Sequence, residues 1–372
     1  MKYYDIKPIL KKNCHYNLMF GERSNGKTYQ VLLYALERFV KYGEQLAVVR
    51  RWREDFKGKR GPQYFENLVC NEKGQNKVKE LTSGEWDRVV YTSSQWFLAR
   101  WDSDTQRNVL NEKPIAYAFA LTETEHDKGN SYNEVSTILV DEFISLTGVY
   151  LPDEFFLAMN CFSTIIRGRD TVKIFLCANA NPFGKYNPYF REMGLKHVSQ
   201  MQKGDIDIYE FGESGLRVAV EYTDSPNKRG KPSDVYFSFD NPKLRVITGG
   251  DWAIDIYPHL TKDFDKKDIC FSYFIKFEDR IMQADIVINS TDRFTFIHEK
   301  TTPIKNENMD IIYSLTPVEN YNNYVSLLNP VNNITKKIAT FFKANKVFYQ
   351  SNEIGEIIAQ YLTQCNKLNT VR

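Results

Sequence analysis

One stretch of the sequence decides the fold: Gly21-Glu22-Arg23-Ser24-Asn25-Gly26-Lys27-Thr28. It fits the pattern G-x-x-x-x-G-K-S/T at every fixed position. A short apolar run ends at Phe20 just before it, and apolar side chains recur with helical spacing over residues 28–41 after it. Glycines let backbone N–H groups surround phosphate oxygens, and the following helix offers its positive N-terminal end. Residues 21–28 are therefore predicted to form a nucleotide-binding loop between a strand and a helix.

A second element supplies carboxylates. The apolar run 136–140 ends at Asp141 and Glu142. At the tip of a buried strand beside a phosphate loop, one carboxylate can hold Mg²⁺ through water, and its neighbour can polarise the attacking water. An acidic pair often merely ends a strand, so this pair gains its meaning from the loop upstream. We assign Lys27 to the β- and γ-phosphates, Thr28 and Asp141 to Mg²⁺, and Glu142 to the water, so ATP and Mg²⁺ are expected ligands.

Other polar residues have less specific signals. Asn179 follows the apolar run 172–178, where its side chain can contact the γ-phosphate or the attacking water and report hydrolysis; a turn-forming asparagine is the alternative. Arg167 and Arg169 end a helix predicted from Pro152, where basic residues commonly stabilise the helix dipole. An arginine at that edge can also enter the nucleotide site of a neighbouring subunit. Arg23 would compete for this role within the same subunit.

The order of elements predicts an α/β protein with two domains. Continuous apolar strands alternate with helices in the first half, which favours a parallel sheet covered on both faces. We expect a P-loop NTPase domain with an additional-strand, RecA-like parallel sheet over residues 1–200, and a linker over residues 201–235, which include a polar Pro- and Gly-containing stretch. Apolar runs at 271–277, 284–288 and 293–298, followed by two helical patterns, predict a smaller α+β domain over residues 236–372.

Composition excludes several classes of protein. The 49 Lys and Arg nearly balance the 47 Asp and Glu, for a formal charge of +2, which excludes a histone-like coat of positive charge and a long acidic tail. The six cysteines show no CxxC spacing, and with five histidines no zinc pattern assembles. No run approaches the ~20 apolar residues of a membrane span. We expect a soluble intracellular protein with no membrane partner.

Together these residues resemble the DNA-packaging ATPases of small short-tailed phages, the phi-29-like group. The phosphate loop and the acidic strand, residues 135–143, match the family, and so does a segment that general P-loop chemistry does not require, residues 38–45 followed by 49–51. Residues 166–169, Asn179 and residues 187–190 match the end of its ATPase domain. The departure is Ser24-Asn25, which replaces a more glycine-rich centre of the loop.

The resemblance implies an ATPase that moves double-stranded DNA into a preformed capsid, as a homo-oligomeric ring, expected to be a pentamer, docked on the capsid portal. It would act in the host cytoplasm while transiently bound to the procapsid; use of a structural RNA is left open. By this resemblance Arg167 is the trans-acting arginine finger, Arg53 a basic lid residue and Lys128 a pore-facing DNA contact. The C-terminal domain would be a vestigial RNase H-like fold used for docking or nucleic-acid binding.

Two alternatives remain at this point. One is a terminase with a working C-terminal nuclease, although Asp285 has no convincing acidic partners in the sequence. The other is an ATP-gated assembly protein that binds nucleotide without moving DNA.

Overall fold

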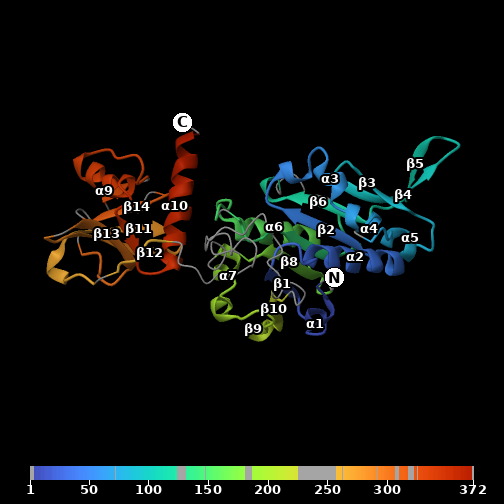
Figure 1. Cartoon of the computed structure of the whole chain (residues 1–372), viewed down its shortest axis with the longest axis horizontal. Coiled ribbons are helices and arrows are strands. Elements are labelled where there is room, and N and C mark those ends of the chain that lie inside the picture. The colour runs from blue at the N-terminus through green and yellow to red at the C-terminus, as the bar shows by residue number, and fades with distance from the viewer. Residues whose placement is uncertain are drawn as a thin grey trace. The chain divides into compact units, whose positions relative to one another are not determined.

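The computed structural model of the 372-residue chain forms two compact units, each described here by itself (Figure 1). The first comprises Met1–Ser145, Asp153–Asn181 and Asn187–Trp252, and the second Leu146–Pro152, Pro182–Tyr186 and Ala253–Arg372. The structure describes residues 4–71, 73–123, 131–146, 148–180, 187–224, 257–261, 263–290, 292–305, 310–316, 322–324 and 326–370.

A large mixed sheet forms the centre of the first unit. Within the described residues its strand order is β3-β4-β6-β2-β7-β8-β1-β10-β9, with β5 beside β4. The strands are β1 (Tyr16–Gly21), β2 (Gln45–Arg50), β3 (Arg88–Thr92), β4 (Gln95–Asp102), β5 (Arg107–Leu110), β6 (Ala116–Ala120), β7 (Val135–Asp141), β8 (Lys173–Asn179), β9 (Ile206–Phe211) and β10 (Leu216–Thr223).

The middle of this sheet is parallel, from β6 through β2, β7, β8 and β1 to β10. Gly21 at the end of β1 pairs in register with Asn179, and Cys177 of β8 pairs with Asp141 at the end of β7. The carboxyl ends of the three strands therefore meet at one edge, where parallel α/β sheets place their ligands. The predicted additional-strand parallel sheet is confirmed.

Helices cover both faces of the sheet. On one face α2 (Lys27–Tyr42) buries Val31, Leu32, Ala35 and Leu36 in the main apolar core, and Tyr34 packs edge-on against Phe175 of β8. Side chains alternate along a strand, so the neighbours of Phe175 face the other way. There lie α6 (Glu154–Ile166), whose Phe162 contacts Tyr16, and α7 (Pro188–Glu192), whose Phe190 contacts Phe20.

Between β2 and β3 the chain forms a run of short helical turns, which we call the cap segment (residues 53–81). Its elements are η1 (Arg53–Phe56), α3 (Arg60–Gln63), α4 (Glu66–Val69) and α5 (Lys77–Leu81). Phe65, Leu68 and Val78 of this segment are buried in the same core as the apolar face of α2. The segment thus packs on the flank of the phosphate-loop helix α2.

The expected linker, residues 201–235, needs correction. Residues 206–223 form β9 and β10, and β10 extends the parallel sheet beside β1. Val218, Ala219 and Val220 are buried there. β10 pairs here because the backbone N–H and C=O groups along this edge of β1 would otherwise lack hydrogen-bond partners. The polar stretch at residues 225–232, on which the linker prediction rested, lies outside the described residues.

The second unit is an α+β fold. Its sheet has the order β15-β14-β11-β12-β13-β16 within the described residues. The elements are β11 (Ile269–Phe277), β12 (Arg280–Ile288), β13 (Arg293–Glu299), β14 (Ile311–Ser314), β15 (Asn322–Tyr324), α9 (Asn333–Lys343), β16 (Val347–Tyr349) and α10 (Asn352–Thr370). The three apolar runs noted in the sequence lie in β11, β12 and β13, which pair as an antiparallel meander. The RNase H-like character stays a prediction.

The short helix α1 (Lys7–Leu10) precedes β1 in the first unit. In the part of the chain that the structure describes, every helix is too short or too polar to cross a bilayer.

Candidate functional site

The loop at residues 21–28 joins β1 to α2 in a tight turn. Ser24 and Gly26 both have left-handed backbone angles, with φ of 58° and 95°. Gly21 lies so close to β10 that a Cβ atom on it would sit 2.1 Å from Thr223 Oγ1. Only glycine fits at this position, and the loop can therefore turn directly out of the buried strand toward the N-terminus of α2.

Asn25 is the internal support of this loop. Its buried side chain donates from Nδ2 to Thr223 Oγ1 at 2.8 Å, and its Oδ1 accepts from Lys27 Nζ at 3.0 Å. The backbone oxygen of Asn25 accepts from the N–H of Tyr4 at 2.9 Å. Thr223 in turn donates to the Phe20 carbonyl at 3.2 Å. The departure at Ser24-Asn25 thus has a physical role, because Asn25 ties the loop to β10.

Lys27 is buried inside the loop, with 5% of its surface exposed. Its Nζ donates to the Glu22 carbonyl at 2.8 Å as well as to Asn25. Burial lowers the pKa of Lys27 to about 8, although Cys177, Asp141, Glu22 and Glu221 act in the opposite direction. The ammonium group is therefore held where an anion entering the loop would meet it.

The structure brings Thr28 and Asp141 together, as the sequence predicted from residues far apart in the chain. Thr28 Oγ1 donates to Asp141 Oδ1 at 2.8 Å. The other carboxylate oxygen, Oδ2, accepts from the Tyr64 hydroxyl at 3.0 Å and lies 3.6 Å from Arg50 Nη1. A hydroxyl and a carboxylate at the end of the sheet form a set of hard oxygen donors of the kind that Mg²⁺ prefers.

Glu142 follows Asp141 in a left-handed backbone conformation, with φ of 59°. Its half-exposed side chain forms an ion pair through Oε2 with Arg50 Nη2. Arg50 also lies 3.5 Å from Asp55 through Nε. Burial acts to lower the pKa of Arg50, but Asp141 and Glu142 outweigh it and raise that pKa. Arg50 is thus the central cation of the acidic edge, a role that sequence analysis did not assign.

Arg51 fixes the backbone next to Glu142. Its guanidinium forms a bidentate pair with the buried Glu154 at the start of α6, with distances of 2.6 and 2.7 Å. It also donates to the carbonyls of Glu142 and Phe143, at 3.4 and 3.2 Å. Tyr189 donates to Glu154 at 3.1 Å. This buried network ties β2, α6 and α7 to the turn that carries the acidic pair.

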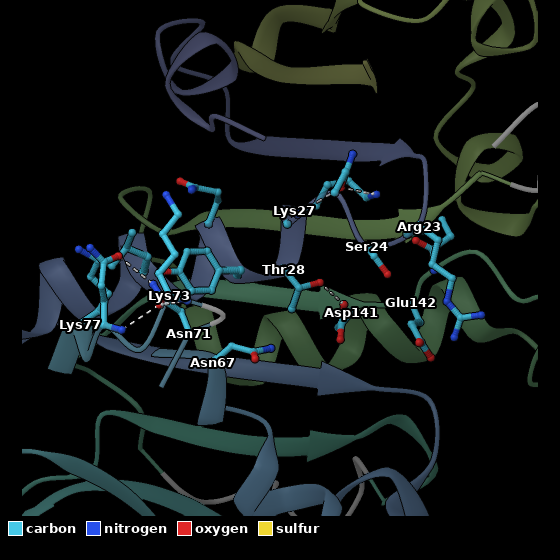
Figure 2. Close-up of a pocket in the computed structure, with 18 residues that line it drawn as sticks. Arg23, Ser24, Lys27, Thr28, Asn67, Asn71, Lys73, Lys77, Asp141 and Glu142 are labelled. Atoms are coloured by element: carbon cyan, nitrogen blue, oxygen red, sulfur yellow. Dashed lines mark hydrogen bonds between the residues drawn. The ribbon is translucent and has the colours of Figure 1, made fainter. Parts of the chain in front are cut away.

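A pocket of about 600 Å³ opens over these groups. Figure 2 shows Thr28 and Asp141 facing each other in its middle, with Arg23 and Glu142 to one side and residues of the cap segment to the other. Asn179 lines it from the end of β8. The cap segment forms another wall of the pocket, which the sequence analysis did not predict. In the sequence this wall is marked by a high density of amide and lysine side chains. The residues are Asn67, Asn71, Lys73, Gln75 and Lys77.

Three other predicted residues lie elsewhere. Arg53 pairs with Glu123 at 2.5 Å and lines a separate cavity of about 180 Å³, so it does not reach the pocket in this structure. Arg167 is exposed at the C-terminal end of α6. The chain passes from this end of α6 to the start of β8. Because β8 runs parallel to β1, its start lies at the sheet edge opposite the phosphate loop, which follows the end of β1. Lys128 lies outside the described residues.

Arg169, two residues after Arg167, has a structural role. Its guanidinium donates to backbone carbonyls of residues 132, 133, 135, 165 and 166, at 2.7 to 3.1 Å. Burial lowers the pKa of Arg169. The pair of arginines predicted from the sequence thus divides into one that holds the fold and one that faces solvent.

This division predicts different stabilities for two alanine variants. Arg169→Ala removes five hydrogen bonds from the guanidinium to backbone carbonyls, and we expect the free energy of unfolding to fall by roughly 2–4 kcal/mol. Arg167→Ala should change it by less than about 0.5 kcal/mol. The tryptophans among the described residues, Trp52, Trp86, Trp96 and Trp101, belong to the first unit, so urea unfolding is followed by tryptophan fluorescence. Equal losses in the two variants would contradict the assignment.

Comparisons with a family model and with curated proteins agree on the kind of protein that this chain resembles. The family model for the podovirus DNA encapsidation protein (Gp16) matches residues 1–82 and 99–358. The DNA packaging proteins of Bacillus phages PZA and phi29 are each 28% identical over 190 residues, which is 50% of this chain and 49% of theirs. The chain thus matches about half the length of these curated relatives.

Two solved structures share the fold. The bacteriophage Phi-29 viral genome packaging motor assembly has a chain with a TM-score of 0.61 and 20% identity, and the match covers 98% of this chain and 99% of that one. The Phi-28 gp11 DNA packaging motor has a TM-score of 0.57 and 15% identity, with 97% of each chain covered.

Proposed function

We propose that this chain, which belongs to the podovirus DNA encapsidation protein (Gp16) family, hydrolyses ATP to drive double-stranded DNA into a preformed capsid. One observation carries the chemical part of the proposal. The hydroxyl of Thr28 and the carboxylate of Asp141 meet at 2.8 Å beside a phosphate loop, and Glu142 is the next residue. The motor function is supported by the family and by the names of the similar DNA packaging proteins.

The donor set fits Mg²⁺. Among the described residues no group of three or more His, Cys, Asp or Glu could hold a metal. Mg²⁺ commonly takes only one or two protein oxygens and completes its shell with water and substrate phosphates. Thr28 and Asp141 would hold the ion, which when bound would neutralise charge on the β- and γ-phosphates.

The residues of the loop would bind and orient ATP. Lys27 would exchange its contacts with Asn25 and the Glu22 carbonyl for phosphate oxygens, and Arg23 and Ser24 would flank the phosphates. Glu142 would orient the attacking water, while Asn179 would contact the water or the γ-phosphate. Arg50 pairs with Glu142 Oε2, so the other carboxylate oxygen, Oε1, would accept the hydrogen bond from that water.

The position of Arg167 favours action in trans. The exposed Arg167 side chain lies at the sheet edge opposite the phosphate loop, so it cannot contact a nucleotide in the pocket of its own subunit. In a ring of identical subunits the same arginine would be presented to a neighbour's nucleotide. The proposed assembly is a pentameric ring on the capsid portal in the host cytoplasm, with Arg53 and Lys128 as candidate basic residues at the lid and the pore.

The nuclease alternative receives little support from the second unit. Asp285 is buried and receives hydrogen bonds from Ser272 at 2.7 Å and Gln283 at 2.9 Å, and it pairs with His298 at 2.9 Å. A two-metal nuclease needs several converging carboxylates, whereas in the described part of the chain Asp285 is hydrogen-bonded to Ser272, Gln283 and His298 rather than set beside a second carboxylate. We propose a docking or nucleic-acid-binding role for this unit; cleavage of supercoiled DNA with Mn²⁺ would instead favour the nuclease.

The water-orienting role of Glu142 can be tested by its amide variant. Glu142→Gln keeps the shape of the side chain but cannot act as a base, so we expect ATP binding to persist while turnover falls at least about 100-fold. Binding is measured by calorimetry and turnover by phosphate release. Glu54→Gln, at an exposed glutamate outside the pocket, is the control. Wild-type turnover in Glu142→Gln would remove Glu142 from this role.

The pKa of Lys27 predicts proton uptake on nucleotide binding. With a pKa of about 8 in the free chain, Lys27 is largely neutral at pH 9, and phosphate oxygens would raise that pKa by favouring the charged form. ATP affinity should therefore fall as the pH rises through 8. Calorimetry at pH 9 in two buffers of different ionisation enthalpy should register uptake in the wild type and not in Lys27→Arg. A buffer-independent heat in the wild type would contradict this prediction.

The trans role of Arg167 predicts complementation between two inactive variants. Arg167→Ala and Glu142→Gln subunits should each fail alone, because an arginine finger contributes ~10³–10⁵ in rate. In mixed rings, some sites combine an intact Glu142 from one subunit with an intact Arg167 from its neighbour. ATP turnover should therefore reappear on mixing. If mixing restores nothing, the trans assignment is wrong.

A further inference from the structure

Tyr64 contacts the acidic edge from outside both sequence motifs. It lies between α3 and α4 in the cap segment, 77 residues before Asp141, and its hydroxyl donates to Asp141 Oδ2 at 3.0 Å. Thr28 donates to the other oxygen, Oδ1. The two oxygens of Asp141 are thus held by two neutral hydroxyl donors from two different elements, and together these donors fix the plane of the carboxylate.

The ring of Tyr64 is itself fixed by aromatic packing. Its centroid lies 5.6 Å from that of Trp96 and 5.9 Å from that of Phe65. Trp96 is fully buried and donates from Nε1 to the Gly61 carbonyl at 2.8 Å. The contact with Asp141 is therefore preorganised.

Arg50 makes this donor necessary. Its Nη1 lies 3.6 Å from Asp141 Oδ2, the oxygen that Tyr64 occupies. If the Tyr64 hydroxyl were absent, Oδ2 would have only the guanidinium to face. The carboxylate would then turn toward Arg50, since a charge-assisted hydrogen bond is the stronger contact. A carboxylate drawn to Arg50 is badly oriented for water molecules around a cation.

We propose that Tyr64 is a positioning residue for the metal site: it holds Asp141 in the orientation that binds Mg²⁺ and keeps it from closing on Arg50. The inference rests on the proposed function of the same pocket. It also gives the cap segment a role, because the segment that contributes Asn67 and Asn71 to the pocket wall is joined through Tyr64 to the metal-binding carboxylate.

The test is Tyr64→Phe, which keeps the ring and removes only the hydroxyl. Loss of such a partner of a metal ligand commonly costs 10–100-fold in metal affinity. Mg²⁺ should increase the affinity of the chain for a fluorescent ADP. We expect the Mg²⁺ concentration that gives half of this increase to be about tenfold higher in Tyr64→Phe than in the wild type. Affinity for the same ADP in EDTA should stay at the wild-type value, because the Tyr64 hydroxyl donates to Asp141 and Tyr64 is not among the described residues that line the pocket.

Tyr91→Phe is the matched control. Tyr91 packs on the same Trp96, at 4.8 Å, and its hydroxyl is not a partner of Asp141. Wild-type Mg²⁺ dependence in Tyr64→Phe, or an equal shift in Tyr91→Phe, would overturn the inference and leave Tyr64 a packing residue. Failure of the wild-type chain to bind the ADP probe at any Mg²⁺ concentration would instead overturn the proposed function, and the inference with it.

Discussion

The hydrogen bond from Thr28 to Asp141 is the contact on which the rest of the site depends. It joins residues that are 113 positions apart, and it forms because β1, β8 and β7 end in register at one edge of a parallel sheet. Around this contact, Arg50 neutralises the acidic pair, Tyr64 holds the second oxygen of Asp141, and Asn25 ties the loop to β10. Arg50, Tyr64 and Asn25 can act on the same site because the phosphate loop and the acidic strand are held together.

The charged side chains of this molecule act mainly through local contacts rather than through a large net charge. A formal charge of +2 excludes a protein that coats nucleic acid with positive charge. Several arginines are also engaged inside the fold: Arg50 with the acidic pair, Arg51 with Glu154, and Arg169 with backbone carbonyls. Arg50 and Arg51 stabilise the edge of the sheet that carries the acidic pair, and Arg169 stabilises the opposite edge. A motor must release its track in every cycle, so a few exposed lysines and arginines suit the proposed function better than a global positive field.

The sequence predicted what depends on local pattern and missed what depends on contact across the sheet. The phosphate loop and the pair Asp141–Glu142 were found because residue types at fixed spacing define them. Arg50 and Tyr64 have no such spacing, since their roles arise only when β2 and the cap segment are folded against β7. The linker prediction failed at residues 206–223, although two alternating runs separated by glycines at 212 and 215 are a signal for the β9–β10 hairpin.

The most direct test of the account is DNA uptake into empty procapsids that carry their portal. The chain is added with linear double-stranded DNA, Mg²⁺ and ATP, and DNA that has entered the capsid is measured as the fraction protected from external nuclease. Protected DNA is expected only when the wild-type chain and ATP are both present. Full ATP turnover by the wild-type chain on these procapsids with no protected DNA would contradict the account and favour an ATP-gated assembly protein.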